Sequence, residues 1–162
     1  MIVEDQERRV ATIMTPDVLT VDPDMSIAEV ARIMVNQGVS GLPVVSNGEI
    51  VGIITENDVV SKEIDVDPPA YGTFLDAIFT LPWDRSDEEL HRVVALTAGE
   101  LMSSPVTTIG ADASIHEAAN LMFKQGVSPI PVVDADGGMI GIISRSDIVR
   151  LIAQAGDSTA TP

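Results

Sequence analysis

Two segments of the chain carry hydrophobic residues at the spacing of an amphipathic helix. One segment follows Ser26 and the other follows Ser114, and a glutamate stands three residues after each serine, as in an N-terminal capping box. Gly38 and Gly126 stand where each helix would end. The positions that form the two hydrophobic stripes are Ile27, Val30, Ala31 and Met34, and then Ile115, Ala118, Ala119 and Met122. The pattern predicts two helices that each bury one face.

Short runs of β-branched residues surround each predicted helix and read as strands. Asn47-Gly48 predicts a two-residue hairpin turn, and residues 136–138 form its longer counterpart. Further helices are predicted over residues 56–62 and 145–154. The predicted strands are 18–21, 42–45 and 50–55 in the first half, and 106–109, 130–133 and 139–144 in the second. Each half therefore has the order β-α-β-β-α.

The two halves are copies of one unit. Residues 14–60 and 102–149 share the blocks Gln-Gly-Val-Ser, Pro-Val-Val and Gly-Ile-Ile-[Thr/Ser]-x-x-Asp in the same order. Roughly 20 of about 47 aligned positions are identical, and the offset changes by a single added residue in the second hairpin turn. A unit of this size buries too little surface alone, so the two copies are expected to pack together.

The repeat divides the chain into units and connecting segments. The segment between the copies is not repeated, and its hydrophobic positions and capping signals predict a helical connector. Most of the chain's few aromatic residues lie in residues 71–83 of this connector, which suggests either a docking surface or internal packing. The predicted boundaries are residues 10–62 for the first unit, 63–97 for the connector, 98–154 for the second unit, and 1–9 and 155–162 for flexible tails.

Composition excludes several classes of protein. The 162 residues are 45% hydrophobic and include 25 acidic against 9 basic residues, for a net charge of −16, which disfavours nucleic acids and anionic membranes as partners. The chain has no cysteine, so thiol chemistry and zinc-thiolate sites are excluded. No hydrophobic run is long enough to span a membrane, and residues 1–9 lack the apolar core of a signal peptide. The expectation is a soluble, cytoplasmic protein.

Two motifs with polar tips, Thr55-x-x-Asp58 and Ser144-x-x-Asp147, follow predicted strands. One interpretation is structural, because a hydroxyl residue followed by an acid three positions later caps a helix. The other is functional, because a helix N-terminus presents free backbone N–H groups to a phosphate and an aspartate can accept both ribose hydroxyls. The two interpretations are compatible if the capped end faces a cleft.

Arg145 is unusual because a cation in the first turn of a helix opposes the helix dipole. Its counterpart in the first copy is Glu56, which obeys the dipole rule. Either Arg145 reaches acidic neighbours on the surface, or it faces an anion. In the second case the cleft at Ser144 would suit a phosphorylated nucleotide. The cleft at Thr55 would then suit adenosine, a sulfonium ligand or a phosphate screened by Mg²⁺.

The doubled Gly-Val-Ser-x-x-Pro-Val-Val and Gly-Ile-Ile-[Thr/Ser]-x-x-Asp blocks resemble those of the cystathionine-β-synthase (CBS) domain, here as a tandem pair called a Bateman module. The resemblance implies an α/β fold of two pseudo-twofold-related units with a cleft on each side for AMP, ADP, ATP or S-adenosylmethionine. It also implies a homodimer. Carried over from the family, one cleft would contain Ser144, Ser146 and Asp147 with Thr20, Val21, Val39 and Ser40. The other would contain Thr55, Asn57 and Asp58 with Thr108, Ile109, Val127 and Ser128.

The resemblance leaves two functions open. In the first, the chain is a regulatory sensor that binds an adenosine ligand, with no required cofactor and no metal site of its own, and modulates an unidentified partner. In the second, the clefts are empty and the chain is an interaction or dimerisation module. An enzyme is not expected, because no general base beside an oriented nucleophile can be proposed. The charge of −16 further predicts that one cleft is favoured.

Overall fold

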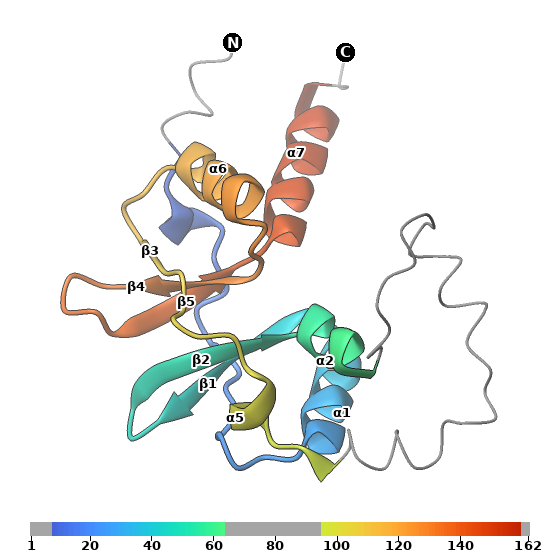
Figure 1. Ribbon diagram of the computed structural model, residues 1–162. Helices are drawn as coiled ribbons and strands as arrows, with labels where there is room; N and C mark the ends of the chain where they lie inside the picture. Colours follow the sequence, from blue (N-terminus) through green and yellow to red (C-terminus); the bar gives the residue numbers. More distant parts are fainter. Residues whose placement is uncertain (1–7, 64–94, 160–162) are drawn as a thin grey trace.

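The structure is a computed structural model that describes residues 8–63 and 95–159. Most of the predicted connector, residues 64–94, lies outside the described residues, and so does the aromatic-rich segment 71–83. The remainder forms two α/β units, as the repeat predicts (Figure 1). In Figure 1 the two β-hairpins point to the same side of the molecule, and the longer helices lie at the other side.

The first unit contains a helix, a hairpin and a second helix. Its elements are α1 (Ile27–Gln37), β1 (Gly41–Ser46), β2 (Glu49–Thr55) and α2 (Glu56–Glu63). β1 and β2 pair antiparallel across the turn predicted at Asn47 and Gly48. Both turn residues have positive φ, 51° and 81°, which the two-residue hairpin requires and which asparagine and glycine tolerate.

The second unit repeats this order with one more short strand. Its elements are β3 (Ile109–Gly110), α6 (Ile115–Gln125), β4 (Ile130–Val133), β5 (Met139–Ile143) and α7 (Arg145–Thr159). β3 pairs parallel with β4, and β4 pairs antiparallel with β5. In the first unit the strand predicted over residues 18–21 is reduced to one parallel bridge between Val21 and Val44. The preceding residues 18–20 are not part of a helix or strand.

Both predicted capping boxes are confirmed. The Ser26 N–H donates to Glu29 Oε2 at 3.2 Å and the Ser114 N–H donates to Glu117 Oε2 at 2.7 Å. The serine hydroxyls accept the return bonds from the glutamate N–H groups. Hydrogen bonds from the Ser26 side chain and backbone lower the pKa of Glu29, and those from the backbone and side chain of Ser114 lower the pKa of Glu117.

These lowered pKa values predict how stability depends on acidity. A carboxylate whose pKa is lower in the folded state contributes stability above its unfolded pKa, and that contribution is lost as the pH falls through the folded value. When the pH is lowered from neutral to acidic, the double variant Glu29→Gln and Glu117→Gln should therefore lose less stability than the parent. Urea unfolding at the two pH values measures this loss as the change in the free energy of unfolding. An equal loss in parent and variant would contradict a role for these two carboxylates.

Each unit is completed by residues that precede the other repeat. The 3₁₀ turn η1 (Val10–Thr12) packs on the second unit, where the Val10 N–H donates to the Ala113 carbonyl at 2.9 Å and Val10 is fully buried. The helix α5 (Ala98–Leu101) packs in the core of the first unit, and the Ala98 N–H donates to the Met25 carbonyl at 2.8 Å. The two units are therefore joined by reciprocal crossings (Figure 1).

Two chain ends differ from the predicted boundaries. α7 continues to Thr159, five residues beyond the end predicted at residue 154. Arg9, predicted as part of a tail, pairs with Ser114 and donates to the Asp112 carbonyl at 2.6 Å. Among residues 8–63 and 95–159, no helix combines the length and the apolar character needed to cross a membrane. The cytoplasmic location stays a prediction.

Candidate functional site

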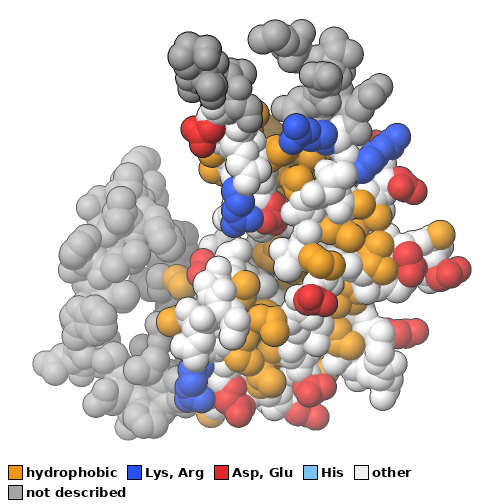
Figure 2. All heavy atoms as spheres, turned by 180° about the vertical axis from the view of Figure 1, so that it is seen from behind, with side chains coloured by type: hydrophobic (Ala, Val, Ile, Leu, Met, Phe, Trp, Pro, Cys, Tyr) orange, Lys and Arg blue, Asp and Glu red, His pale blue; other side chains and the backbone are white. Residues whose placement is uncertain are grey.

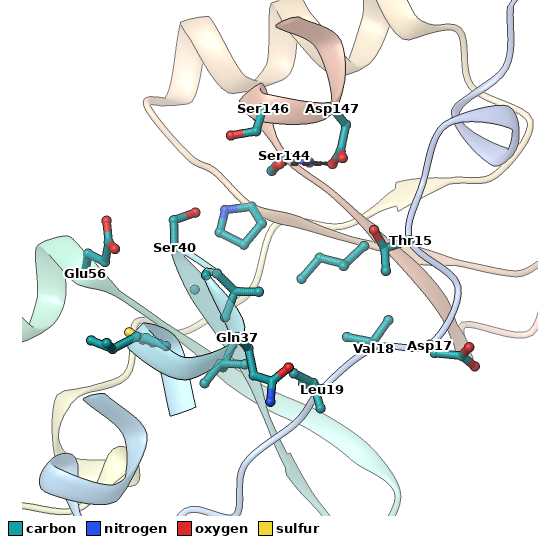
Figure 3. A pocket seen from close by; sticks show the side chains of 18 of the residues that line it. Thr15, Asp17, Val18, Leu19, Gln37, Ser40, Glu56, Ser144, Ser146 and Asp147 are labelled. Carbon is teal, nitrogen blue, oxygen red and sulfur yellow. Dashed lines mark hydrogen bonds between the residues drawn. The ribbon is translucent and has the colours of Figure 1, made fainter. Parts of the chain in front are cut away.

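A hollow in the described part of the chain lies between the two units (Figure 3). Its volume is about 780 Å³, within the range of small-molecule sites. Figure 3 shows Ser144, Ser146 and Asp147 at the start of α7 on one side, with Val18, Leu19 and Gln37 of the first unit across from them. A molecule in this cavity would touch both units.

The start of α7 is shaped by the Ser144-x-x-Asp147 motif. Asp147 Oδ2 accepts hydrogen bonds from the Ser144 N–H at 2.7 Å and from the Ser144 hydroxyl at 2.9 Å. These bonds form the carboxylate half of the capping box that the structural interpretation predicts, while the Asp147 N–H donates to the Ser144 carbonyl at 3.1 Å. Asp147 is nevertheless among the residues that line the cavity. The capped helix end thus faces a cleft, so the structural and functional interpretations are compatible here.

The other oxygen of Asp147 meets a residue that the sequence analysis missed. Arg150 Nη1 donates to Asp147 Oδ1 at 3.1 Å, and the Arg150 side chain is 66% exposed while that of Asp147 is 10% exposed. Arg150 also lines the cavity. The signal was available in the sequence, since a cation three residues after an aspartate shares its helix face.

The first unit contributes hydrophobic and small polar groups to the cavity. Val39 and Ser40 line it, as predicted. Thr20 and Val21 are not among its lining residues, and Val21 is 2% exposed and packs in the core of the first unit. Further lining residues that the predicted set lacks include Val18, Leu19, Gln37 and Pro129.

The second predicted cleft, at Asp58, has different side-chain hydrogen bonds from the cavity at Asp147. Asp58 Oδ2 accepts from the Thr55 N–H at 2.7 Å and the Thr55 hydroxyl at 2.8 Å, as in the other unit, but Asp58 Oδ1 accepts from the Ser103 hydroxyl at 3.0 Å. The Thr107 hydroxyl donates to Gln125 Oε1 at 2.8 Å. The positions equivalent to Thr107 and Gln125 in the other repeat are Leu19 and Gln37, which line the large cavity.

The remaining residues predicted for the second cleft are dispersed. Thr55, Asn57 and Ser128 line a smaller hollow of about 180 Å³ together with Ser40, Ser144, Arg145 and Ser146. Thr108 is exposed, Ile109 is buried in the second core, and Val127 packs against that core.

Arg145 lies at this smaller hollow and not among the residues lining the large cavity. Its backbone N–H donates to the Ser128 hydroxyl at 3.2 Å, and its Nη2 donates to the Met122 carbonyl at 3.5 Å. Met122 lies near the C-terminal end of α6, where helix carbonyls carry partial negative charge. This contact accounts for a cation at the start of α7, and an anion-binding role for Arg145 stays a prediction.

Comparison with known proteins identifies the family. The family model of the CBS domain matches residues 10–65 and 98–154, and the chain belongs to the CBS domain family. A pair of CBS domains is a regulatory module and not a catalytic one. Within residues 8–63 and 95–159, no cluster of three or more histidine, aspartate or glutamate side chains is placed to hold a metal ion.

Two curated relatives show the extent of the match. The uncharacterized protein MJ0188 of Methanocaldococcus jannaschii is 28% identical over 142 residues, which cover 88% of this chain and 43% of that protein. The chloroplastic CBS domain-containing protein CBSX2 of Arabidopsis thaliana is 28% identical over 152 residues, covering 90% of this chain and 63% of that protein. The chain thus spans less than two thirds of the length of both relatives.

Solved structures of CBS pairs have the same fold. The crystal structure of CBSX2 in complex with AMP has a TM-score of 0.65 at 25% identity and covers 91% of this chain and 98% of its own. The CBS pair of MJ0100, in complex with 5′-methylthioadenosine and S-adenosylmethionine, has a TM-score of 0.66 at 26% identity, with the same coverage. CBS pairs similar to this chain therefore bind adenosine compounds.

Proposed function

We propose that the chain is a regulatory sensor that binds an adenosine ligand in the cavity between its two CBS units. The observation that carries the proposal is that Asp147 and Ser146 of the second unit and Gln37 and Ser40 of the first unit line one cavity of about 780 Å³. A ligand that contacts both units favours one relative packing of them over others, which is how occupancy can reach a partner. The adenosine complexes of CBSX2 and MJ0100 support the ligand class.

The lining residues suggest how an adenosine ligand would lie. The Asp147 carboxylate can accept hydrogen bonds from the two ribose hydroxyls, as acidic residues do in dinucleotide sites. Val18, Leu19 and Val39 offer aliphatic surface to the faces of adenine. No aromatic residue is among the described lining residues, so adenine would pack against aliphatic groups. We include in this proposal a ligand whose phosphate charge is screened by Mg²⁺.

Isothermal titration calorimetry tests this proposal. AMP, ADP, ATP, NADH and S-adenosylmethionine are titrated into the chain, each with and without Mg²⁺. We expect saturable heat with at least one of them. Absence of binding to all five below millimolar concentration would contradict the sensor and favour the ligand-free interaction module.

We further propose that the cavity at Asp147 is occupied in preference to the cleft at Asp58. Two hydrogen bonds support this preference: Ser103 to Asp58 Oδ1 and Thr107 to Gln125. A ligand at Asp58 would compete with the first bond, whereas at Asp147 the corresponding oxygen is bonded by a largely exposed arginine. The expected stoichiometry is one ligand per chain.

A second copy of the chain is the partner that the exposed hydrophobic residues favour. Val35 on α1 and Phe123 on α6 are 80% and 86% exposed and occupy equivalent positions in the two repeats, as do Val60 on α2 and Val149 on α7. Figure 2 shows hydrophobic side chains gathered along the middle of one face, with many acidic side chains at its rim and a few among them. A hydrophobic surface that repeats about a pseudo-twofold axis suits an isologous contact.

The double variant Phe123→Asp and Val149→Asp tests the homodimer. We expect sedimentation velocity to give a dimer for the parent chain and a monomer for the variant, because two carboxylates would be buried at the contact. Ala135→Asp is the control, since Ala135 is exposed in the turn between β4 and β5, away from the helices (Figure 1). A monomeric parent, or a variant that stays dimeric, would contradict the proposed dimer.

A further inference from the structure

Arg150 holds a distinctive position in the charge distribution of the cavity. Among the described residues that line the cavity, three are acidic and one is basic; they are Asp17, Glu56 and Asp147, and Arg150. With three negative charges against one positive, the wall carries a net charge of −2, and it would carry −3 without Arg150. The whole chain carries −16, so the wider surface also repels an anion.

The contact that holds Arg150 is easily exchanged. Its guanidinium donates to Asp147 Oδ1 at 3.1 Å within one helix turn, and the side chain is 66% exposed. The pair joins an exposed arginine to a largely buried aspartate that keeps its two bonds from Ser144, so the guanidinium can move to another acceptor without leaving the carboxylate unpaired. A guanidinium has five donors in a planar fork and binds phosphate oxygens in pairs.

Resting on the proposed function, we propose that Arg150 determines the charge class of the ligand and makes the cavity selective for adenosine compounds that carry a phosphate. When a ribose binds Asp147, its hydroxyls displace Arg150 from the carboxylate. Arg150 then turns to the phosphate oxygens. Neutral adenosine has no anionic group for Arg150, so the guanidinium competes with its ribose for Asp147.

The test compares AMP with adenosine in calorimetric titrations of the parent chain, Arg150→Gln and Arg150→Lys. In the parent we expect AMP to bind more tightly than adenosine. Arg150→Gln should lower the ratio of AMP affinity to adenosine affinity at least tenfold, by weakening AMP and leaving adenosine unchanged or tighter. Arg150→Lys keeps the charge and should retain part of the preference. Raising the salt concentration screens repulsion by the acidic wall in both proteins and attraction by Arg150 in the parent alone, so the ratio should rise more in Arg150→Gln than in the parent.

Arg32→Gln is the control that removes the same charge, because Arg32 is an exposed arginine on α1 and is among the lining residues of neither hollow. It should leave the affinity ratio unchanged. An unchanged ratio in Arg150→Gln, an equal loss for AMP and adenosine, or the same fall in Arg32→Gln would each overturn the role of Arg150 while leaving the sensor intact. A parent chain that binds neither AMP nor adenosine, nor any ligand of the panel, would overturn the proposed function and this inference together.

Discussion

Replacing Asp147 with asparagine is expected to weaken binding of AMP by roughly 10- to 100-fold, the effect of losing a hydrogen bond to a charged group. The amide oxygen of the variant can still accept from Ser144 and keep the cap of α7. The amide nitrogen would replace the oxygen that now accepts from Arg150, and a nitrogen donor cannot accept from a ribose hydroxyl. Titration calorimetry with AMP measures the change.

Asp58→Asn is the matched control, because Asp58 occupies the equivalent position in the other repeat and has the same contact with its own capping residue, Thr55. We expect this variant to bind AMP with nearly the affinity of the parent. Equal losses in the two variants would show that both clefts contribute. A loss confined to Asp58→Asn would place the ligand at the other cleft and contradict the assignment of the cavity.

Gly41→Ala is expected to destabilise the chain by about 1–3 kcal/mol, the usual cost of overpacking a closely packed contact. Gly41 begins β1 and lies against Pro129 of the second unit. A Cβ on Gly41 would lie 2.6 Å from Pro129 Cδ and 3.2 Å from the Ile54 carbonyl oxygen. A proline ring and a backbone carbonyl cannot swing aside, so the two units would have to separate.

Differential scanning calorimetry should show this as a fall in Tm of roughly 3–9 °C. Because Gly41 and Pro129 both line the cavity, AMP binding should weaken in the same variant. Gly110→Ala is the control, since a Cβ there meets no atom within 4 Å. A Tm for Gly41→Ala equal to that of the control would contradict a tight contact between the units at this point.

Much of the fold could be predicted because its signals are local. Two capping boxes, at Ser26 and Ser114, determine where α1 and α6 begin, and the Asn47-Gly48 turn determines where the chain reverses between β1 and β2. Each of these signals involves residues at most three positions apart. The crossings were not predictable in this way. Val10 joins the core of the second unit and Ala98 that of the first, and such long-range packing leaves no periodic pattern in the sequence. For the same reason the strand expected over residues 18–21 shortens to one bridge.

The candidate site was predicted in part. The resemblance led to Ser144, Ser146 and Asp147 with Val39 and Ser40, and the structure brings these residues to one cavity. It did not lead to Arg150, because the family blocks end at the aspartate. Arg145 instead stands out in the sequence, as a cation that opposes the dipole of α7, and its side chain donates to the Met122 carbonyl near the end of α6. The difference between the clefts depends on side-chain contacts such as Thr107 with Gln125, which only the structure shows.

A crystal structure of the chain with AMP tests the central claim most directly, because it locates the ligand. We expect AMP in the cavity between the units, with its ribose hydroxyls within hydrogen-bond distance of the Asp147 carboxylate. AMP bound at Asp58 alone, or on a surface that touches only one unit, would contradict it.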